Sequence, residues 1–412
     1  MATRLEIAQL LADDRATEPG SVVLSQDRAR SLSSSFVRAI RNGRPTMGVG
    51  SDIGTSAAAA ALVHLVSWQL PIDNLSNGVT LLLDESRAEV VDGARTLRSS
   101  LPPSLQGAVQ IAVLKDGREQ TVDVAEGAPD FTHSKGAERW KLLLDKWRVA
   151  NPPSLAQLLM EKVDSPSVRL YPMLSGNPRT GHWSMRIDGL EVGRVSSSKS
   201  YLDVGHTSAA GHVSPARGKW LGVNPSGRFA FDESTVDSAA RLLQSLITSF
   251  ESSDGALDHG QPEHALESRV LRGLVPVRTG GSTLDVWLED GLVSRGSQFP
   301  TLWTERGRPK YLDALLRHGS TPWAVELKVL KSGGSGSYYR HGLAQAVLYR
   351  HFIQSAVPLH PWFAEQGVVP VECRAAVAFP KFTGTNEAYE ARVALLRELG
   401  SLFNVEVIEL EA

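Results

Sequence analysis

The fold of the C-terminal part of this 412-residue chain is decided by one stretch, Tyr311-Leu-Asp-Ala-Leu-Leu-Arg-His-Gly-Ser-Thr-Pro-Trp-Ala-Val-Glu-Leu-Lys-Val-Leu330. Residues 311–316 and 323–330 have the composition of strands, and residues 317–322 between them contain Gly, Ser and Pro. Because these three residue types favour turns, the stretch predicts a β-hairpin.

Charged side chains share one face of this predicted hairpin. Side chains alternate across a strand, so Glu326 and Lys328 point to one side while their apolar neighbours point to the core. With Asp313 opposite them, two carboxylates and an ammonium converge, an arrangement that is costly to bury without a cation or a substrate. Carboxylate oxygens suit Mg²⁺ or Mn²⁺, so we expect Asp313 and Glu326 to bind one of these metals.

Phosphodiester hydrolysis is the chemistry that needs such a trio. A metal held by carboxylates lowers the pKa of a bound water and draws charge from the phosphate, while a lysine orients or deprotonates the attacking water. The following segment, 341–350, predicts a helix with Gln345 and Tyr349 four residues apart on one face. Both side chains can therefore reach the same site.

Asp313, then Glu326-Leu-Lys328 after twelve intervening residues, then Gln345-x-x-x-Tyr349 resembles the PD-(D/E)xK nuclease superfamily, in its branch with a Gln-x-x-x-Tyr helix. The resemblance covers residues 263–412 and implies a restriction-endonuclease-like α/β core with a mixed sheet. It also implies that the Asp and Glu bind the metal, the Lys acts at the attacking water, and the Gln and Tyr line the site near the DNA.

The superfamily core begins with a helix that carries a glutamate. Residues 264–271 resemble that helix, which implies that Glu267 is a supporting catalytic residue, with Glu263 as the alternative. An exposed helix carboxylate remains an equal interpretation of Glu267. Leu312 precedes Asp313 where the superfamily name has Pro, and members vary at this position.

Basic residues are concentrated around this motif. From Thr301 to Arg350 they outnumber acidic residues by eight to three, which favours a polyanionic partner. Four residues flank the Gly/Ser-rich loop at 332–337 and are candidates for nucleic-acid binding by stacking and charge: Lys331, Tyr338, Tyr339 and Arg340. The alternative for the Tyr-Tyr-Arg part is a loop anchor that packs on the domain.

The N-terminal part predicts a different layer. Short apolar runs alternate with helical patterns at residues 46–50, 55–69, 78–84, 87–99 and 108–114. This β-α-β-α-β order is typical of a parallel sheet flanked by helices, so we expect a Rossmann-like α/β part over residues 1–115.

Residues 116–252 predict a β-rich segment with a tight hairpin at Asp188-Gly189, and it ends in a connecting helix over 233–250. Residues 253–262 have the composition of a linker. The chain is therefore expected to be a multidomain protein of the α/β and α+β classes.

The glycine-containing turn at residues 47–54 follows a predicted strand and precedes a helix, as a phosphate-binding turn would. Its spacing differs from the dinucleotide fingerprint, and an ordinary strand-to-helix turn is the favoured interpretation. Asp84 ends the next strand, at the edge of the sheet where ligands of open α/β folds bind. An equal interpretation is that Asp84 caps the helix that follows.

Composition excludes several classes. The single cysteine, Cys373, cannot form an intramolecular disulfide or a thiolate zinc site, which indicates a cytoplasmic protein. We expect no membrane segment, since the most apolar stretch, Ala57 to Leu70, is too short. A net charge of −2 argues neither for wholesale coating of nucleic acid nor for an acidic solvating tail.

We therefore expect a Mg²⁺- or Mn²⁺-dependent nuclease, with DNA as the favoured substrate and an N-terminal region that senses a nucleotide or protein activator. This plan is similar to that of prokaryotic antiviral defence effectors. The alternative is a module that binds nucleic acid or a partner without cutting it; a nucleotide-binding enzyme in the N-terminal half ranks last. Superfamily members often dimerise, so a homodimer stays open.

Overall fold

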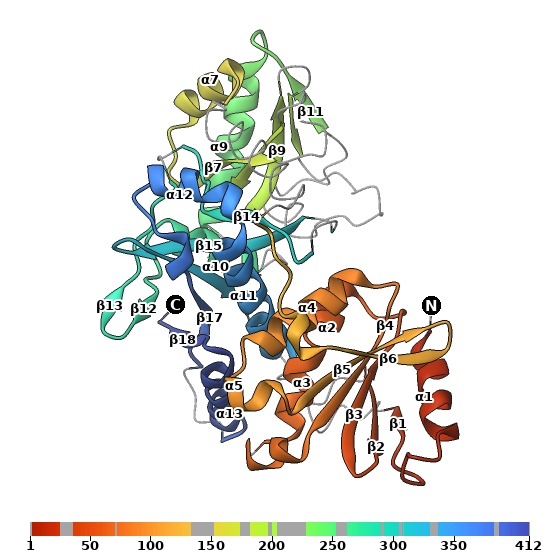
Figure 1. The fold of residues 1–412 in the computed structure, drawn as a ribbon. Coiled ribbons are helices and arrows are strands. Elements are labelled where there is room, and N and C mark those ends of the chain that lie inside the picture. The colour runs from red at the N-terminus through yellow and green to blue at the C-terminus, as the bar shows by residue number, and fades with distance from the viewer. Residues whose placement is uncertain are drawn as a thin grey trace.

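The computed structural model describes residues 2–24, 36–70, 72–132, 152–173, 182–196, 200–203, 228–252, 262–289, 292–304, 307, 309–329, 337–382 and 387–411. Within these residues the protein is mixed α/β, with one six-stranded, two five-stranded and one two-stranded sheet (Figure 1). No helix of this described part is long and apolar enough to cross a membrane.

The first sheet has its strands in sequence order: β1 (Val23–Leu24), β2 (Val37–Arg41), β3 (Arg44–Val49), β4 (Val79–Asp84), β5 (Val109–Lys115) and β6 (Arg118–Val122). β3, β4 and β5 are parallel, as the alternating pattern predicted, and the outer strands are antiparallel. The sheet extends beyond residue 115 because Asp116 and Gly117, both with positive φ, form a hairpin turn into β6.

Helices cover both faces of this sheet: α1 (Arg4–Asp13), α2 (Thr55–Ala59), α3 (Ala61–Trp68) and α4 (Ala88–Ser99), with η2 (Ile72–Asn77), α5 (Pro103–Gln106) and η3 (Val124–Glu126) as short connections. α1 packs on one face, where Ile7 and Leu11 join a small apolar cluster with Leu82. α2, α3 and α4 pack on the other face. The helix predicted over 55–69 is interrupted at Ala60, where α2 ends and α3 begins.

The second sheet is an antiparallel meander of β7 (Val168–Met173), β8 (His182–Ile187), β9 (Leu190–Ser196), β10 (Ser200–Asp203) and β11 (Arg228–Phe231). α7 (Ser154–Val163) and α9 (Val236–Ser252) share an apolar core with it. The hairpin predicted at Asp188-Gly189 is confirmed, since both residues have positive φ and Ile187 pairs with Leu190. The linker prediction for 253–262 falls almost wholly outside the described residues.

The third sheet contains β14 (Ser297–Thr301), β15 (Lys310–His318), β16 (Thr321–Leu327), β17 (Arg374–Pro380) and β18 (Glu406–Leu410). β14, β15 and β16 are antiparallel, whereas β16, β17 and β18 are parallel. The hairpin predicted from residue 311 to 330 is confirmed. Its turn is shorter than expected because Arg317 pairs with Pro322 and His318 with Thr321.

Helices precede and connect these strands: α10 (Pro262–Leu271), α11 (Ser337–Ser355), η4 (Val357–Leu359), α12 (His360–Glu365), η5 (Pro370–Glu372) and α13 (Glu387–Phe403). α11 lies between β16 and β17 in sequence, and α13 between β17 and β18, so both are crossovers of parallel strands. A two-stranded ribbon, β12 (Arg278–Thr279) and β13 (Ser282–Thr283), completes this part.

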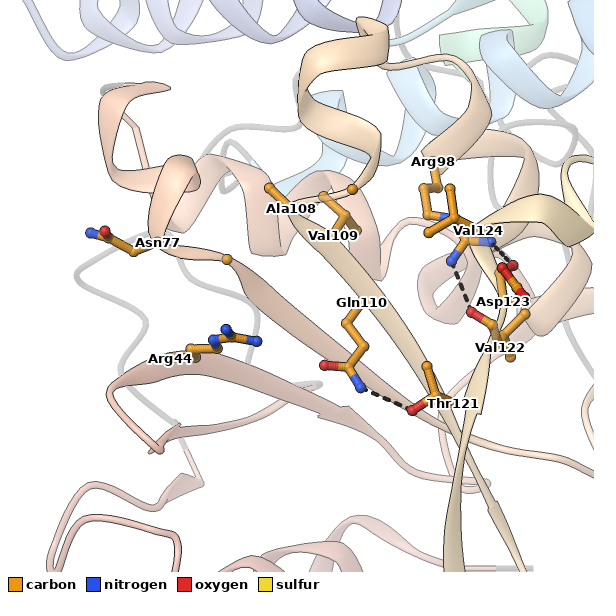
Figure 2. A pocket seen from close by; sticks show the side chains of 12 residues that line it. Arg44, Asn77, Arg98, Ala108, Val109, Gln110, Thr121, Val122, Asp123 and Val124 are labelled. Carbon is orange, nitrogen blue, oxygen red and sulfur yellow. Dashed lines mark hydrogen bonds between the residues drawn. The ribbon is translucent and has the colours of Figure 1, made fainter.

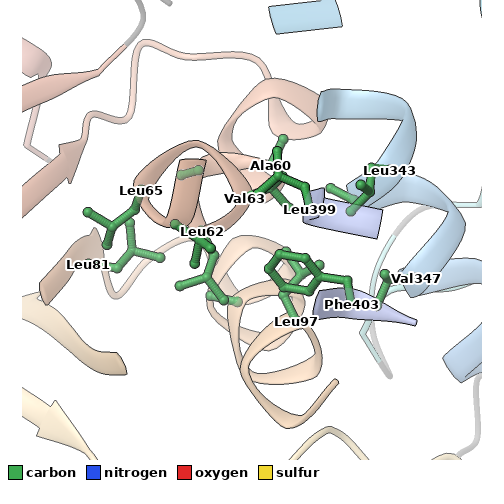
Figure 3. Packing of buried hydrophobic residues seen from close by; sticks show 14 of the residues in the cluster. Ala60, Leu62, Val63, Leu65, Leu81, Leu97, Leu343, Val347, Leu399 and Phe403 are labelled. Atoms are coloured by element: carbon green, nitrogen blue, oxygen red, sulfur yellow. The ribbon is translucent and has the colours of Figure 1, made fainter. Parts of the chain in front are cut away.

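The first and third sheets are joined through a shared helical layer. α2, α3 and α4 pack against α11 and α13, and one apolar core includes Leu62 and Leu97 from the first part with Leu343, Val347 and Phe403 from the last (Figure 3). The N-terminal part therefore shares a core with the part of the chain that carries the predicted motif, although more than 200 residues of sequence separate them.

Candidate functional site

Three polar residues face one another across neighbouring strands: Gln298 of β14, Asp313 of β15 and Glu326 of β16. The pairing of β15 with β16 reaches Ala314 and Val325, and the next residues of the two strands are Asp313 and Glu326. β14 pairs with β15 at Ser297 with Ala314 and at Phe299 with Leu312, so Gln298 and Asp313 lie between these two pairs. The hairpin thus brings together the two carboxylates that the sequence predicted as metal ligands.

Lys328 connects these carboxylates. Its Nζ atom donates to Oε1 of Glu326 at 2.7 Å and to the backbone oxygen of Leu327 at 3.0 Å, and it lies 3.9 Å from Oδ2 of Asp313. Oδ2 of Asp313 also accepts a hydrogen bond from the backbone N–H of Leu327 at 2.9 Å. The trio expected from sequence is therefore assembled around one ammonium group.

The site is largely buried, and burial changes the ionisation of its members. The side chains of Asp313, Glu326 and Lys328 are 19%, 1% and 6% exposed. Burial, and then the charge of Glu326, raises the pKa of Asp313 well above its usual range. Burial also raises the pKa of Glu326, against the opposing effect of Lys328. For Lys328, burial lowers the pKa, but the surrounding carboxylates outweigh it and the net shift is upward.

A divalent cation at this site would need the same oxygens. Oε2 of Glu326 is buried and has no fixed hydrogen-bond donor among the residues that the structure describes, and the Glu326 carboxylate lies at hydrogen-bond distance from that of Asp313. The Lys328 ammonium already occupies a point where oxygens of Glu326, Leu327 and Asp313 converge. No group of three or more His, Cys, Asp and Glu side chains in the described ranges forms a metal-ligand set. A cation bound here would have two carboxylates and a backbone carbonyl as its protein ligands.

α10 places two further carboxylates near this site. Glu267 is buried, accepts hydrogen bonds from Ser297 and from Nε2 of Gln298, and its charge contributes to the raised pKa of Asp313. Glu263, one turn earlier, lies 3.6 Å from Nζ of Lys328. Both candidates from the predicted helix therefore face the site, and Glu267 is not the exposed carboxylate of the alternative interpretation.

Gln345 and Tyr349 lie on α11 within hydrogen-bond distance of each other, at 3.3 Å. The Tyr349 hydroxyl donates to the backbone oxygen of Tyr311 at 3.0 Å, and its ring is buried against Trp303. Burial, and then the charges of Glu326 and Asp313, raise the pKa of Tyr349. Tyr349 is thus beside the carboxylates but bonded to the neighbouring strand.

The predicted nucleic-acid-binding residues differ in their placement. Tyr339 is buried and stacks on Phe379 with ring centroids 4.4 Å apart, and Arg340 is buried and donates to Oγ of Ser67 at 2.8 Å. These contacts correct the prediction for both residues, because they agree with a loop anchor and not with contact to nucleic acid. Lys331 and the side chain of Tyr338 lie outside the described residues.

Sequence reasoning missed Gln298. It has a left-handed φ of 54°, a conformation that costs a non-glycine residue about 1 kcal/mol, and its side chain donates to the buried carboxylate of Glu267. The residues that flank Gln298 in the sequence do not indicate its left-handed backbone conformation. The signal is the cross-strand register, which places it beside Asp313.

The hairpin tip of the second sheet holds α10 in place, and this was also not visible in the sequence. A Cβ atom on Gly189 would lie 2.0 Å from the backbone oxygen of His264, so only glycine permits the contact. Asp188 is buried beside two arginines of the α10 region, 3.5 Å from Arg269 and 3.2 Å from Arg272. The helix that carries Glu263 and Glu267 is therefore anchored by the second sheet.

The glycine turn after β3 is closed by the protein itself. The backbone N–H and Nε of Arg4 both donate to Asp52, at 3.0 and 2.7 Å, and Arg87 donates to the backbone oxygen of Gly50 at 3.0 Å. The carboxylate of Asp84 accepts hydrogen bonds from the backbone of Ala2 and from Ser86. These bonds are those of an ordinary strand-to-helix turn, the favoured interpretation.

A cavity of about 530 Å³ lies at the opposite edge of the first sheet (Figure 2). The guanidinium of Arg98 donates to the backbone oxygens of Val122 and Asp123 at 3.2 and 2.7 Å, and Gln110 donates to Thr121 at 3.0 Å. The buried guanidinium of Arg98 is therefore already hydrogen-bonded to the protein backbone. None of the predicted catalytic residues lines this cavity.

Comparison of the chain with protein-family models, with curated proteins and with solved structures gives no significant match.

Proposed function

We propose that the protein is a divalent-metal-dependent nuclease whose active site is the Asp313, Glu326 and Lys328 cluster. One observation carries the proposal: the buried carboxylate of Glu326, the partly buried carboxylate of Asp313 and the ammonium of Lys328 converge at one point between two neighbouring strands. Such an arrangement is costly to maintain without a function.

The surrounding architecture supports the same proposal. The chain contains, in this order, a helix with glutamates (α10), three antiparallel strands (β14, β15 and β16), a crossover helix (α11) and a parallel strand (β17). The β12–β13 ribbon lies between α10 and β14, and η4, α12 and η5 lie between α11 and β17. This order is similar to the core of the PD-(D/E)xK superfamily suggested by the motif. The motif residues lie on the second strand, the third strand and the crossover helix of that arrangement.

The residues have distinct tasks in this proposal. Asp313 and Glu326 would hold a Mg²⁺ or Mn²⁺ ion, which lowers the pKa of a bound water and withdraws charge from the phosphate. Lys328 has a raised pKa and stays protonated at neutral pH, so it acts as a hydrogen-bond donor that orients water and neutralises phosphate charge. A protonated lysine cannot deprotonate the attacking water, so of the two roles that the motif suggested, only the orientation of the water remains in this proposal.

A polyanionic substrate is favoured by the residues around the site. Tyr311 precedes Asp313 by two positions on the same side of β15 and is 40% exposed, so its ring is available to stack on a base. Basic residues also predominate in this part of the sequence, although Arg340 and Arg350 are buried and Lys310 pairs with Glu89. We favour DNA as the substrate, and an N-terminal part that senses an activator, as in prokaryotic defence effectors.

One observation favours the alternative, a module that binds without cutting. Glu326 and Lys328 are almost fully buried, whereas the attacked phosphate of a cleaved substrate must reach them. The side chains of Asp313 and Glu263 are 19% and 34% exposed, so solvent reaches the cluster beside these two residues.

The test is cleavage of circular and linear, single- and double-stranded DNA and RNA with Mg²⁺ or Mn²⁺. The wild type is compared with Glu326→Gln, which keeps the shape of the side chain but removes the charge. Glu398→Gln, on the exposed face of α13, is the matched control. The proposal predicts cleavage by the wild type and the control and a loss of at least about 100-fold in Glu326→Gln. Binding without cleavage by all three proteins favours the alternative.

A further inference from the structure

The stem of Lys328 lies directly against a glycine of α11. A Cβ atom added to Gly342 would lie 3.0 Å from Cγ and 3.2 Å from Cε of Lys328, and 3.0 Å from Cγ2 of Val377. These distances are shorter than ordinary contacts between carbon atoms, so any side chain at this position displaces a neighbour. Gly342 therefore provides the space in which the lysine stem runs.

The lysine cannot yield at its other end without losing its partners. Its Nζ atom is held 2.7 Å from Glu326 and 3.0 Å from the backbone oxygen of Leu327. Val377 of β17 lies against the same position of α11 and is fully buried, so it has little room to move away. An added Cβ therefore requires the lysine stem or Val377 to shift by a few tenths of an ångström, and a shift of the stem changes the geometry of the ammonium at its oxygens.

The residues just before Gly342 connect the same turn of α11 to the N-terminal part. Arg340 donates to Oγ of Ser67 on α3 at 2.8 Å. The ring of His341 packs edge-on against His64, also on α3, with centroids 5.2 Å apart. Three consecutive residues of α11 thus contact α3 on one side and the lysine of the candidate site on the other.

We propose that Gly342 is a positioning residue for Lys328, and that α3 of the N-terminal part fixes this position through Arg340 and His341. The catalytic importance of this position rests on the proposed nuclease function, but the placement of the ammonium can be tested without a cleavage assay. The N-terminal part is then a direct structural support of the catalytic lysine.

The experiment compares Gly342→Ala with Gly93→Ala in the full chain. Gly93 is the matched control because it lies in α4 beside α2 and α11, where an added Cβ would meet Ala59 at 3.6 Å and Leu348 at 3.8 Å, both ordinary contacts. The first readout is the rate at which Lys328 is modified by an amine-directed reagent, followed by mass spectrometry. The second is the split of the cleavage rate into kcat and KM.

We expect Gly342→Ala to increase the modification rate of Lys328 several-fold and to lower kcat by about tenfold to 100-fold with KM nearly unchanged. Gly93→Ala should resemble the wild type in both readouts. Ser67→Ala, which removes the bond from Arg340 without crowding the lysine, should change both in the same direction but by less.

Wild-type modification of Lys328 in Gly342→Ala would overturn the proposal, whatever the cleavage assay shows. Full restoration of both readouts by adding Val377→Ala would also overturn it, because the strain would then lie against β17. The absence of cleavage in the wild type would count against the nuclease function alone, since the modification rate still reports where the ammonium lies.

Discussion

The Nζ atom of Lys328 lies 2.7 Å from Oε1 of Glu326, so two residues on the same side of one chain segment form a buried ion pair. Asp313 lies 3.9 Å from the same ammonium, and burial together with the charge of Glu326 raises its pKa, so a second ionised carboxylate is disfavoured here. A buried cluster that resists holding both carboxylates ionised lowers the stability of the fold, and a bound cation would relieve this repulsion.

Asp313→Asn should stabilise the protein at neutral and alkaline pH. Burial and the charge of Glu326 raise the pKa of Asp313, so the folded protein holds this proton to a higher pH than the unfolded chain does. The contribution of the group to stability is therefore present below its unfolded pKa and is lost as the pH rises through the folded pKa. Asparagine keeps an oxygen for the N–H of Leu327 but cannot ionise.

The measurement is the melting temperature of both proteins between pH 4 and pH 9, without divalent metal. We expect the difference to increase with pH, with the variant melting at the higher temperature at pH 8. A wild type that melts above Asp313→Asn at pH 8 would show that ionised Asp313 is stabilised by groups not recognised in this cluster.

Mn²⁺ should raise the melting temperature of the wild type and leave that of Glu326→Gln unchanged. A ligand that binds only the folded state stabilises it by RT ln(1 + [L]/Kd), about 2.7 kcal/mol at 100 times Kd. The substitution removes the charge of the Glu326 carboxylate, which lies beside that of Asp313 and the ammonium of Lys328. Sodium chloride at matched ionic strength is the control, and an equal rise in both proteins would place the cation elsewhere.

Tyr349→Phe should cost stability more than activity. The hydroxyl donates to the backbone oxygen of Tyr311 and accepts from Gln345, and its loss leaves a buried carbonyl with one partner fewer. We expect a decrease of about 1 kcal/mol in the free energy of unfolding, measured by urea denaturation. Cleavage should stay within a few-fold of the wild type.

Tyr311→Phe is the matched control, because it removes the hydroxyl of an exposed tyrosine beside the same site. It should leave the free energy of unfolding unchanged. If Tyr349→Phe lost as much cleavage as Glu326→Gln, the tyrosine would belong to the catalytic group and not to the support of β15.

Gly189→Ala should destabilise the contact between the second sheet and α10. Gly189 has φ of +85°, and an added Cβ would lie 2.0 Å from the backbone oxygen of His264. Gly43 has φ of +70° in another hairpin with nothing within 4 Å of an added Cβ, so Gly43→Ala reports the backbone strain alone. We expect about 1 kcal/mol for Gly43→Ala and at least about 3 kcal/mol for Gly189→Ala.

Urea denaturation of the two variants checks this prediction, with limited proteolysis as a second readout of the hairpin. Equal losses in both variants would mean that the hairpin separates from His264 at little cost. Because α10 carries Glu263 and Glu267, Gly189→Ala should also reduce cleavage, whereas Gly43→Ala should not.

The sequence by itself determined the local elements and the residues that share a face. The two-residue period of strands fixed that Glu326 and Lys328 lie on the same side, and the turn residues after Arg317 fixed the hairpin that brings Asp313 opposite them. The alternation of apolar runs and helical patterns likewise indicated the parallel strands β3, β4 and β5. These features depend on neighbours in the chain, so they can be read from it.

The tertiary structure alone decided which side chains remain available for function. Tyr339 and Arg340 looked suited to nucleic acid but are buried, because α11 packs into a core shared with helices more than 200 residues earlier. The contact of Gly189 with His264 and the fit of Gly342 to Lys328 also join distant segments. Whether a residue is exposed depends on what packs over it, and neither its type nor its local pattern contains that information.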